Sequence, residues 1–453
     1  MRYFNHRYFL LILLFSASCK KFLDTPANSS QNLINGLDEC QALLNDPRVM
    51  NGFLNGGYPA RIETSTDDLY VTTEQFNGLG TMDKKVYIWD PQLTTGSAFP
   101  DWDLPYRTVL TANTVLAKLT KLSSAGQQAR WNGIKGSALF FRAFAFYQLA
   151  QTFSPPYDSS TAAHDLGIPL RLSDDINEKI TRSTVQQTYD QILKDLRDAG
   201  SLLPRDSGWL PSRPSPAAVY ALTSRVFLSA RDYRSALAYA DSSLHLNHML
   251  MDYDTISRTM RFPFYKFNPE VIFSAAYYVM GPAAGGSRCH VDSNLFRSYT
   301  SNDLRKVLFF KDGDSFYGRY DENGAPFAGL TSSEMILTRS ECYVRIHDTA
   351  NAMADLNHLL KTRWAAGTFI PYTAATEDDA LQKILLERRK ELLFRGIRWS
   401  DLRRLNKDSA TAHLLTRMVN GTLYTLYAKD ARYTLPIPDD VLAANPGMQQ
   451  NPR

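Results

Sequence analysis

The chain has 453 residues, of which 44% are hydrophobic, so it can bury a large core. Its 50 Lys and Arg nearly balance its 46 Asp and Glu, which argues against nucleic acid as a partner because phosphate binding needs a clear basic excess. None of the four cysteines stands at C-x-x-C spacing, so a zinc site has little support. If Cys19 carries lipid, three cysteines remain, and this odd number argues against a disulfide framework, although one bridge could form.

The N-terminus has the pattern of a bacterial lipoprotein signal. Two arginines precede a short apolar run at residues 8–15, and small residues then lead to Cys19. The run is too short to span a bilayer, which takes about 20 residues. We therefore expect removal of residues 1–18 and lipidation of Cys19, which would anchor the protein to a membrane. The alternative is an ordinary secretory signal, since Ser16 stands where lipoprotein signals usually carry an aliphatic residue.

Residues 138–150 form the next apolar stretch. They include Arg142 and Gln148 and are too few to span a bilayer, so we predict a buried core helix. Further along, residues 183–186 read Ser-Thr-Val-Gln, the sequence of a capping box at a helix start. Apolar residues then recur at helical spacing as far as Leu203, which predicts a helix behind this box.

Later segments carry similar start signals. The predicted capping residues are Ser215, Asp232, Thr331 and Thr376. Residues 217–240 fit two short helices joined by a tight turn, which is typical of a tetratricopeptide-like pair. No repeat of fixed length is visible, so divergence or long insertions are required. These signals predict a mainly α fold.

Two long segments, residues 51–102 and 252–330, lack a clear helical pattern, as does the proline-rich tail after residue 435. Irregular segments of this length are uncommon unless they carry function. Sugar rings are held by stacking on aromatic faces beside polar groups that bind hydroxyls. The candidates are Tyr70, Phe76, Tyr87 and Trp89, beside Asp67, Asp68, Asn77 and Asp83, and Phe316, Tyr317 and Tyr320, beside Asp314, Arg319 and Asn323. We expect two or three of these aromatic residues to form a platform; the alternative for each is that it anchors its loop to the scaffold.

An ordered set of short motifs runs along nearly the whole chain. They are Cys19–Asp24, Trp102 with Tyr106, Asn113–Leu116, Gly136–Phe144, Leu166–Pro169, Arg182–Val185 with Tyr189 and Asp195–Leu196, Asn268–Phe273, Asp303–Arg305, Glu334 with Arg339–Cys342, Glu387–Leu392 with Arg398 and Asp401–Leu402, Leu435–Pro438, and Gln450–Pro452. Each motif is weak alone, but their order and spacing are specific. With them the chain resembles the SusD/RagB family of outer-membrane nutrient-binding lipoproteins, known from Bacteroidetes.

The resemblance implies about four tetratricopeptide-like helix pairs packed against an irregular, loop-rich lobe. It divides the chain into a signal at 1–18, an N-terminal part at 19–250 and a C-terminal part at 251–453 of the same globular unit. It also implies a lipid-anchored protein facing the cell exterior over a TonB-dependent transporter of the SusC type, which captures glycans or, in some members, peptides. Ligand residues vary between members, so none is carried over, and Trp102 and Tyr106 are assigned to packing.

Glu387 and Glu391 lie four residues apart, hence on one helix face, where a carboxylate pair could serve a glycosidase. We favour an ion-pair network on a solvated helix face, because charges near a core need partners. The expected partners are Arg388, Arg395, Arg398 and Asp401.

The remaining polar motifs give no site. His245 and His248 lack a third metal ligand and fit a helix end with surface histidines. The acidic turns at 312–314 and 321–324 would form a calcium loop only if Phe316 were an acid or amide. A phosphate loop and a nucleophile with its base are also missing, so we predict no enzyme activity, no metal and no cofactor.

Four hypotheses remain. The leading one is a non-catalytic glycan-binding lipoprotein that serves a transporter. The others are a peptide-binding member of the same system, a surface glycoside hydrolase that uses Glu387 or Glu391, and a purely structural scaffold.

Overall fold

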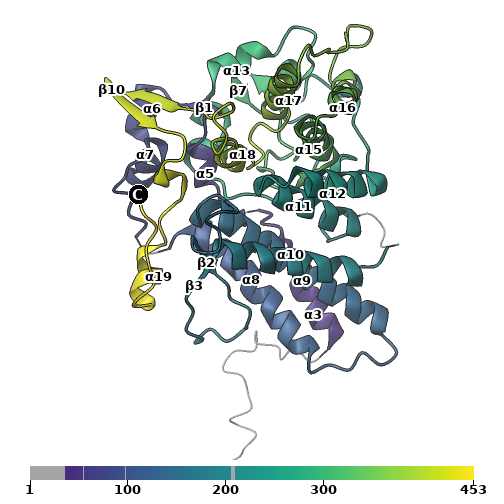
Figure 1. The fold of residues 1–453 in the computed structure, drawn as a ribbon, viewed down its shortest axis with the longest axis vertical. Helices are drawn as coiled ribbons and strands as arrows, with labels where there is room; N and C mark the ends of the chain where they lie inside the picture. Colours follow the sequence, from purple (N-terminus) through teal and green to yellow (C-terminus); the bar gives the residue numbers. More distant parts are fainter. Residues whose placement is uncertain (1–35, 55, 97, 206–209) are drawn as a thin grey trace, which may run out of the picture.

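The structure is a computed structural model that describes residues 36–54, 56–96, 98–205 and 210–453. Helices dominate this part of the chain, and each sheet within it has two strands. The larger helices form the helical scaffold (Figure 1). They are α3 (Leu37–Leu44), α8 (Pro100–Leu119), α9 (Gln128–Phe153), α10 (Val185–Leu202), α11 (Pro216–Ser229), α12 (Tyr233–Leu246), α15 (Ser332–Arg345), α16 (Thr349–Lys361), α17 (Glu377–Glu391) and α18 (Arg398–Leu405).

Successive helices of the scaffold pack side by side. Helix α8 packs on α9, α9 on α10, α11 on α12 and α15 on α16, and further contacts of α10 with α11 and of α12 with α15 link these pairs into one array (Figure 1). The predicted mainly α fold with tetratricopeptide-like helix pairs is therefore confirmed.

The predicted helix starts agree with the structure, with one shift. Ser215, Asp232, Thr331 and Thr376 each accept a backbone N–H in the first turn of their helix. The capping box of α10 lies one residue later than predicted, with Thr184 and Gln187 in place of Ser183 and Gln186. Ser183 instead donates its hydroxyl to the carbonyl of Ile168, a contact between the paired strands β2 (Leu166–Pro169) and β3 (Arg182–Thr184).

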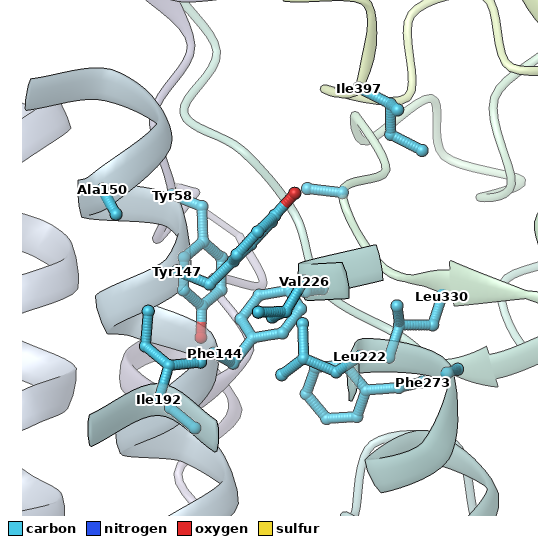
Figure 2. Packing of buried hydrophobic residues seen from close by; sticks show 14 of the residues in the cluster. Tyr58, Phe144, Tyr147, Ala150, Ile192, Leu222, Val226, Phe273, Leu330 and Ile397 are labelled. Carbon is cyan, nitrogen blue, oxygen red and sulfur yellow. The ribbon is translucent and has the colours of Figure 1, made fainter. Parts of the chain in front are cut away.

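The core of the scaffold is centred on α9. Every residue from Ala138 to Phe153 is buried, as predicted for a core helix. Phe144 points toward Leu222 of α11 and toward Phe273, whose ring centroid lies 5.2 Å from that of Phe144 (Figure 2). Burying one such side chain contributes about 2–3 kcal/mol. Across the described helices, none combines the length and apolar character that a membrane span requires.

Short elements make up the rest of the chain. They are α4 (Pro47–Met50), α5 (Arg61–Thr64), β1 (Leu69–Tyr70), α6 (Thr73–Gly78), α7 (Thr81–Tyr87), β2 (Leu166–Pro169), β3 (Arg182–Thr184), η1 (Tyr253–Thr255), β4 (Val271–Phe273), η2 (Gly281–Ala284), η3 (Gly286–Arg288), β5 (His290–Val291), α13 (Ser293–Ser298), α14 (Arg305–Phe309), β6 (Phe310–Lys311), β7 (Ser315–Phe316), β8 (Leu330–Thr331), β9 (Leu415–Val419), β10 (Thr422–Leu426), η4 (Ala431–Tyr433) and α19 (Asp439–Ala444). We call residues 51–99, 252–330 and 406–453 together the loop lobe.

The segments of the loop lobe are joined by pairing between distant parts of the chain. Strand β1 pairs antiparallel with β5, so that Leu69 lies opposite Val291 and Tyr70 opposite His290. A second link runs from the amide of Ala276 to the carbonyl of Asn51. The two segments predicted to be irregular therefore form one structure.

Two elements in the C-terminal region, a hairpin before the predicted tail and a helix within it, were missed by the sequence prediction. Residues 415–426 form a β-hairpin whose turn residues, Asn420 and Gly421, both have positive φ, and the Asn-Gly pair is the usual signal for such a turn. The tail contains the short helix α19, contrary to the predicted non-helical tail. Pro438 precedes this helix, and Asp439 and Asp440 place carboxylates in its first turn, where the helix dipole favours them.

Candidate ligand-binding site

Most of the predicted platform residues are buried. These are Phe76, Tyr87, Trp89, Phe316, Tyr317 and Tyr320. In the first segment, the Tyr87 ring lies 3.7 Å from the guanidinium of Arg417, and Trp89 donates its indole N–H to the carbonyl of Ser65 at 2.9 Å. These rings anchor their loops, so the prediction that they form an exposed platform is corrected.

The candidate rings of the second segment, residues 252–330, are also held by contacts within the protein. Phe316 stacks on Phe394 with ring centroids 5.0 Å apart. Tyr320 donates to Glu270 at 2.6 Å and lies under the guanidinium of Arg395. A ring held on both faces by protein atoms has no face left for a sugar, and sequence spacing alone could not show this because the partners are distant in the chain.

Tyr70 is the exception, with 37% of its surface exposed. Its ring stacks on His290, with centroids 5.1 Å apart and planes inclined by 22°. His290 Nδ1 lies 2.8 Å from Asp314 Oδ1, at the turn between β6 and β7. Two segments of the loop lobe, residues 51–99 and 252–330, thus bring together an exposed aromatic ring, an imidazole and a carboxylate, which we call the Tyr70 cluster. Strands of two residues leave little periodic signal, so the sequence did not reveal His290.

A glycine-rich turn, residues 281–288, leads into the Tyr70 cluster and fits closely against its neighbours. A Cβ on Gly281, whose φ is +49°, would lie 2.8 Å from the Asp83 carboxylate, so glycine is required there. Gln75 of α6 donates its side-chain amide to the carbonyl of Ser287 at 3.1 Å. The neighbouring Arg288 is exposed. Gln75 and Arg288 therefore lie at the turn that leads to His290.

The polar residues predicted beside the platform fall into two groups. Asp314 belongs to the Tyr70 cluster, and the exposed Asn77 exchanges side-chain hydrogen bonds with Asn420 of the hairpin. The others serve the fold: Asp67 pairs with Arg398 and Arg389. Burial alone would raise the pKa of Asp67, but these two guanidinium groups hold it well below its usual range.

The other four predicted polar residues also serve the fold. They are Asp68, Asp83, Arg319 and Asn323. Asp68 is buried against Arg389 at 2.7 Å, and Asp83 is half-buried beside the turn at Gly281. Arg319 is buried and donates to the carbonyls of Ala284 and Gly324. The amide of Asn323 donates to Asp321 within its turn.

Glu387 and Glu391 belong to a buried ionic network, not to an exposed carboxylate pair. Both residues are at most 2% exposed. Glu387 pairs with Arg305 at 2.6 Å and Lys390 at 3.0 Å, and Glu391 pairs with Arg363 at 2.7 Å. The predicted ion-pair network is therefore present, but it is buried and not solvated. Its direct partners are residues that the prediction did not name, while the predicted Arg395 acts on Glu391 only through its charge.

The partners expected for this pair have other roles. Arg388 binds Asp401 at 2.8 Å, and Arg398 binds Asp67. Burial raises the pKa of Glu391, but Arg363 and Arg305 more than offset it and keep that pKa below its ordinary value. A general acid needs the opposite shift and access to substrate.

The histidine and cysteine side chains were the remaining candidates for a metal or thiol site. His245 and His248 are exposed at the end of α12, and the described residues contain no group of three or more His, Cys, Asp or Glu placed to hold a metal. Cys40, Cys289 and Cys342 are buried and free. The predicted lipidation site, Cys19, lies outside the described residues.

These features define a class of protein in which a tetratricopeptide-like scaffold supports a loop lobe with an exposed aromatic cluster. Two sequence models match the chain: one for residues 21–228, described as starch-binding associating with outer membrane, and one for residues 263–453, described as the SusD family. Together they cover most of the chain. The chain belongs to the SusD family.

Solved structures agree with this assignment. A SusD superfamily protein from Bacteroides thetaiotaomicron is 22% identical, with a TM-score of 0.75 over 92% of this chain and 100% of that chain. A SusD-like carbohydrate binding protein from Bacteroides vulgatus is 21% identical, with a TM-score of 0.69 over 91% and 97%. A SusD superfamily protein from Bacteroides fragilis is 20% identical, with a TM-score of 0.73 over 92% and 100%. No curated protein matches the chain.

Proposed function

We propose that this protein is a non-catalytic glycan-binding lipoprotein of the outer membrane that delivers oligosaccharide to a TonB-dependent transporter of the SusC type. The observation that carries the ligand class is the exposed Tyr70 ring, backed by His290 and Asp314. Membership of the SusD family, whose matching models include one described as starch-binding, supports the same class.

The geometry gives each residue a role. The free face of Tyr70 stacks on the C–H face of a sugar ring, while His290 supports the other face and fixes the ring plane. Asp314 orients the imidazole through Nδ1. Gln75 and Arg288, at the edge of the cluster, supply donors for sugar hydroxyls.

The test uses the protein from residue 20 onward, titrated calorimetrically with a panel of oligosaccharides and peptides. We expect Tyr70→Ala to weaken binding of the sugar that the parent binds by about tenfold, which corresponds to 1.4 kcal/mol. Tyr265→Ala is the matched control, because Tyr265 is an exposed tyrosine of the loop lobe outside the cluster. Equal affinity of the parent and Tyr70→Ala would disprove the proposed site.

The same titrations separate the other functions. Peptide binding that depends on Tyr70 would favour the peptide-binding member of the system. Release of reducing sugar would contradict the non-catalytic role and would call for Glu387→Gln as the next variant. The anchor is tested separately, since Cys19→Ala in the full-length chain should move the protein from the membrane fraction to the soluble fraction.

A further inference from the structure

A hollow of about 1020 Å³ lies in the helical scaffold, and we call it the scaffold groove. Its described walls are the C-terminal end of α3, α9 around Phe141, the start of α11, the end of α12, and residues 203–205 and 210–215 between α10 and α11. No residue of the Tyr70 cluster lines it. Figure 1 shows these helices away from the end of the molecule where β10 and α6 lie. The scaffold groove is therefore separate from the proposed glycan site.

Aliphatic side chains form much of the scaffold groove. They are Leu44, Leu203, Leu210, Leu246, Met249 and Ile272. Leu246 and Met249 expose 52% and 53% of their surfaces, which is high for apolar residues gathered at one concave place. Exposed apolar surface with a polar rim marks an interaction site.

The charged side chains around the scaffold groove are mainly basic. Arg205 and Arg213 line it, are exposed, and make no side-chain hydrogen bond or ion pair to any other described residue. His245 and His248 lie on the same rim. Asp241 is the one acidic residue among the described lining residues, and Arg339 of α15 already binds it at 2.7 Å. An entering ligand therefore meets unneutralised guanidinium groups.

Two aromatic residues, Phe141 and Tyr220, belong to the described lining of the scaffold groove. Phe141 is buried, and Tyr220 is half-buried with its ring centroid 6.2 Å from that of Tyr239, so neither offers the open ring face that Tyr70 does. Aliphatic side chains instead pack against aliphatic side chains, and guanidinium groups bind carboxylates in a bidentate manner. The volume of about 1020 Å³ lies at the upper end of the range of ligand sites, about 300–1,000 Å³, and it suits a short peptide segment.

We propose that the scaffold groove binds an acidic peptide segment of a partner protein. Aliphatic side chains of this segment enter the apolar floor, and its carboxylates pair with Arg205 and Arg213. The proposal depends on charge complementarity and apolar shape and does not rest on the function proposed for the Tyr70 cluster.

The test is an array of twelve-residue peptides that share the same number of leucines but carry either glutamate or lysine at the remaining positions. Binding of the protein from residue 20 onward is measured on the array and then by fluorescence anisotropy. We expect the acidic series to bind, with affinity that falls as salt rises. The double variant Arg205→Glu/Arg213→Glu should weaken binding at least tenfold.

The matched control is Arg107→Glu/Arg297→Glu, which changes the net charge equally at two exposed arginines that do not line the scaffold groove. This control should bind like the parent. Leu246→Ser should also weaken the acidic peptides, which separates the groove from a general charge effect. The proposal fails if no acidic peptide binds, if the lysine series binds equally well, or if both double variants lose the same affinity.

Discussion

The helical scaffold and the loop lobe satisfy the hydrogen-bonding groups of their buried backbone in different ways. In the scaffold, α9 buries a continuous run of mainly apolar residues, and its backbone groups bond within the helix. In the loop lobe, the irregular backbone leaves carbonyl groups without such partners, and arginine side chains donate hydrogen bonds to them instead. Arg417, for example, donates to the carbonyls of Thr64, Thr66 and Tyr87. One arginine offers five donors, so a single side chain can satisfy several carbonyls that no helix serves.

This difference predicts how each region responds to damage. When an apolar side chain of the scaffold is truncated, the loss of unfolding free energy varies, because it depends on how far the neighbouring side chains relax into the cavity. Loss of an arginine in the loop lobe leaves several buried polar groups unsatisfied at once. The predictions below test this contrast.

The largest effect is expected from Arg305→Met. Arg305 is fully buried and binds Asp303 at 2.8 Å and Glu387 at 2.6 Å. Its removal leaves uncompensated buried carboxylates, so the free energy of unfolding should fall by about 3–5 kcal/mol in urea titrations. Arg258→Met, which removes an exposed pair with Asp254, should cost under about 1 kcal/mol. Similar costs for both variants would refute the claim that buried arginines stabilise the loop lobe, on which the contrast depends.

A second effect concerns Glu63 of α5. It is 1% exposed, and neither carboxylate oxygen has a hydrogen-bond partner among the described residues. Burial, with help from Asp68, raises its pKa to about 8. The folded state therefore keeps a proton that the unfolded state releases near pH 4.5, so stability is lost as the pH rises through this interval.

Glu63→Gln should remove this dependence. Relative to the variant, the parent should lose roughly 1–4 kcal/mol of unfolding free energy between pH 4.5 and 8, measured in urea at a series of pH values. Glu74→Gln, at an exposed site, should run parallel to the parent. If the Glu63→Gln curve also ran parallel, the carboxyl group would already be ionised in the folded state.

The smallest effect is expected in the scaffold. Asp232 caps α12 by accepting the amide of Ser235 at 3.0 Å. Asp232→Ala should lower the unfolding free energy by about 1 kcal/mol, while Asp232→Asn keeps the acceptor and should cost little. Thermal unfolding followed by circular dichroism compares the two variants, and an equal loss in both would show that the cap contributes nothing.

The sequence predicted the scaffold better than the loop lobe for a physical reason. Capping residues and helical periodicity act over a few residues, so the start of α12 at Asp232 could be read directly. The burial of the Tyr87 ring depends on its contact with Arg417, which lies 330 positions away in the sequence. The pairing of Tyr70 with His290 likewise joins strands of two residues from distant segments. Local patterns identified the aromatic candidates but could not show which ring would remain exposed.

The three described cysteines have a practical consequence. All are free and buried, and burial raises the pKa of Cys289 to about 12 and also raises those of Cys40 and Cys342. Since only the thiolate reacts readily with alkylating reagents, these thiols should resist labelling in the native state. In the protein from residue 20 onward, a cysteine introduced at the exposed Thr422 of the hairpin would therefore accept a single fluorophore without removal of these three cysteines. Such a probe would report movement of the loop lobe in single-molecule experiments.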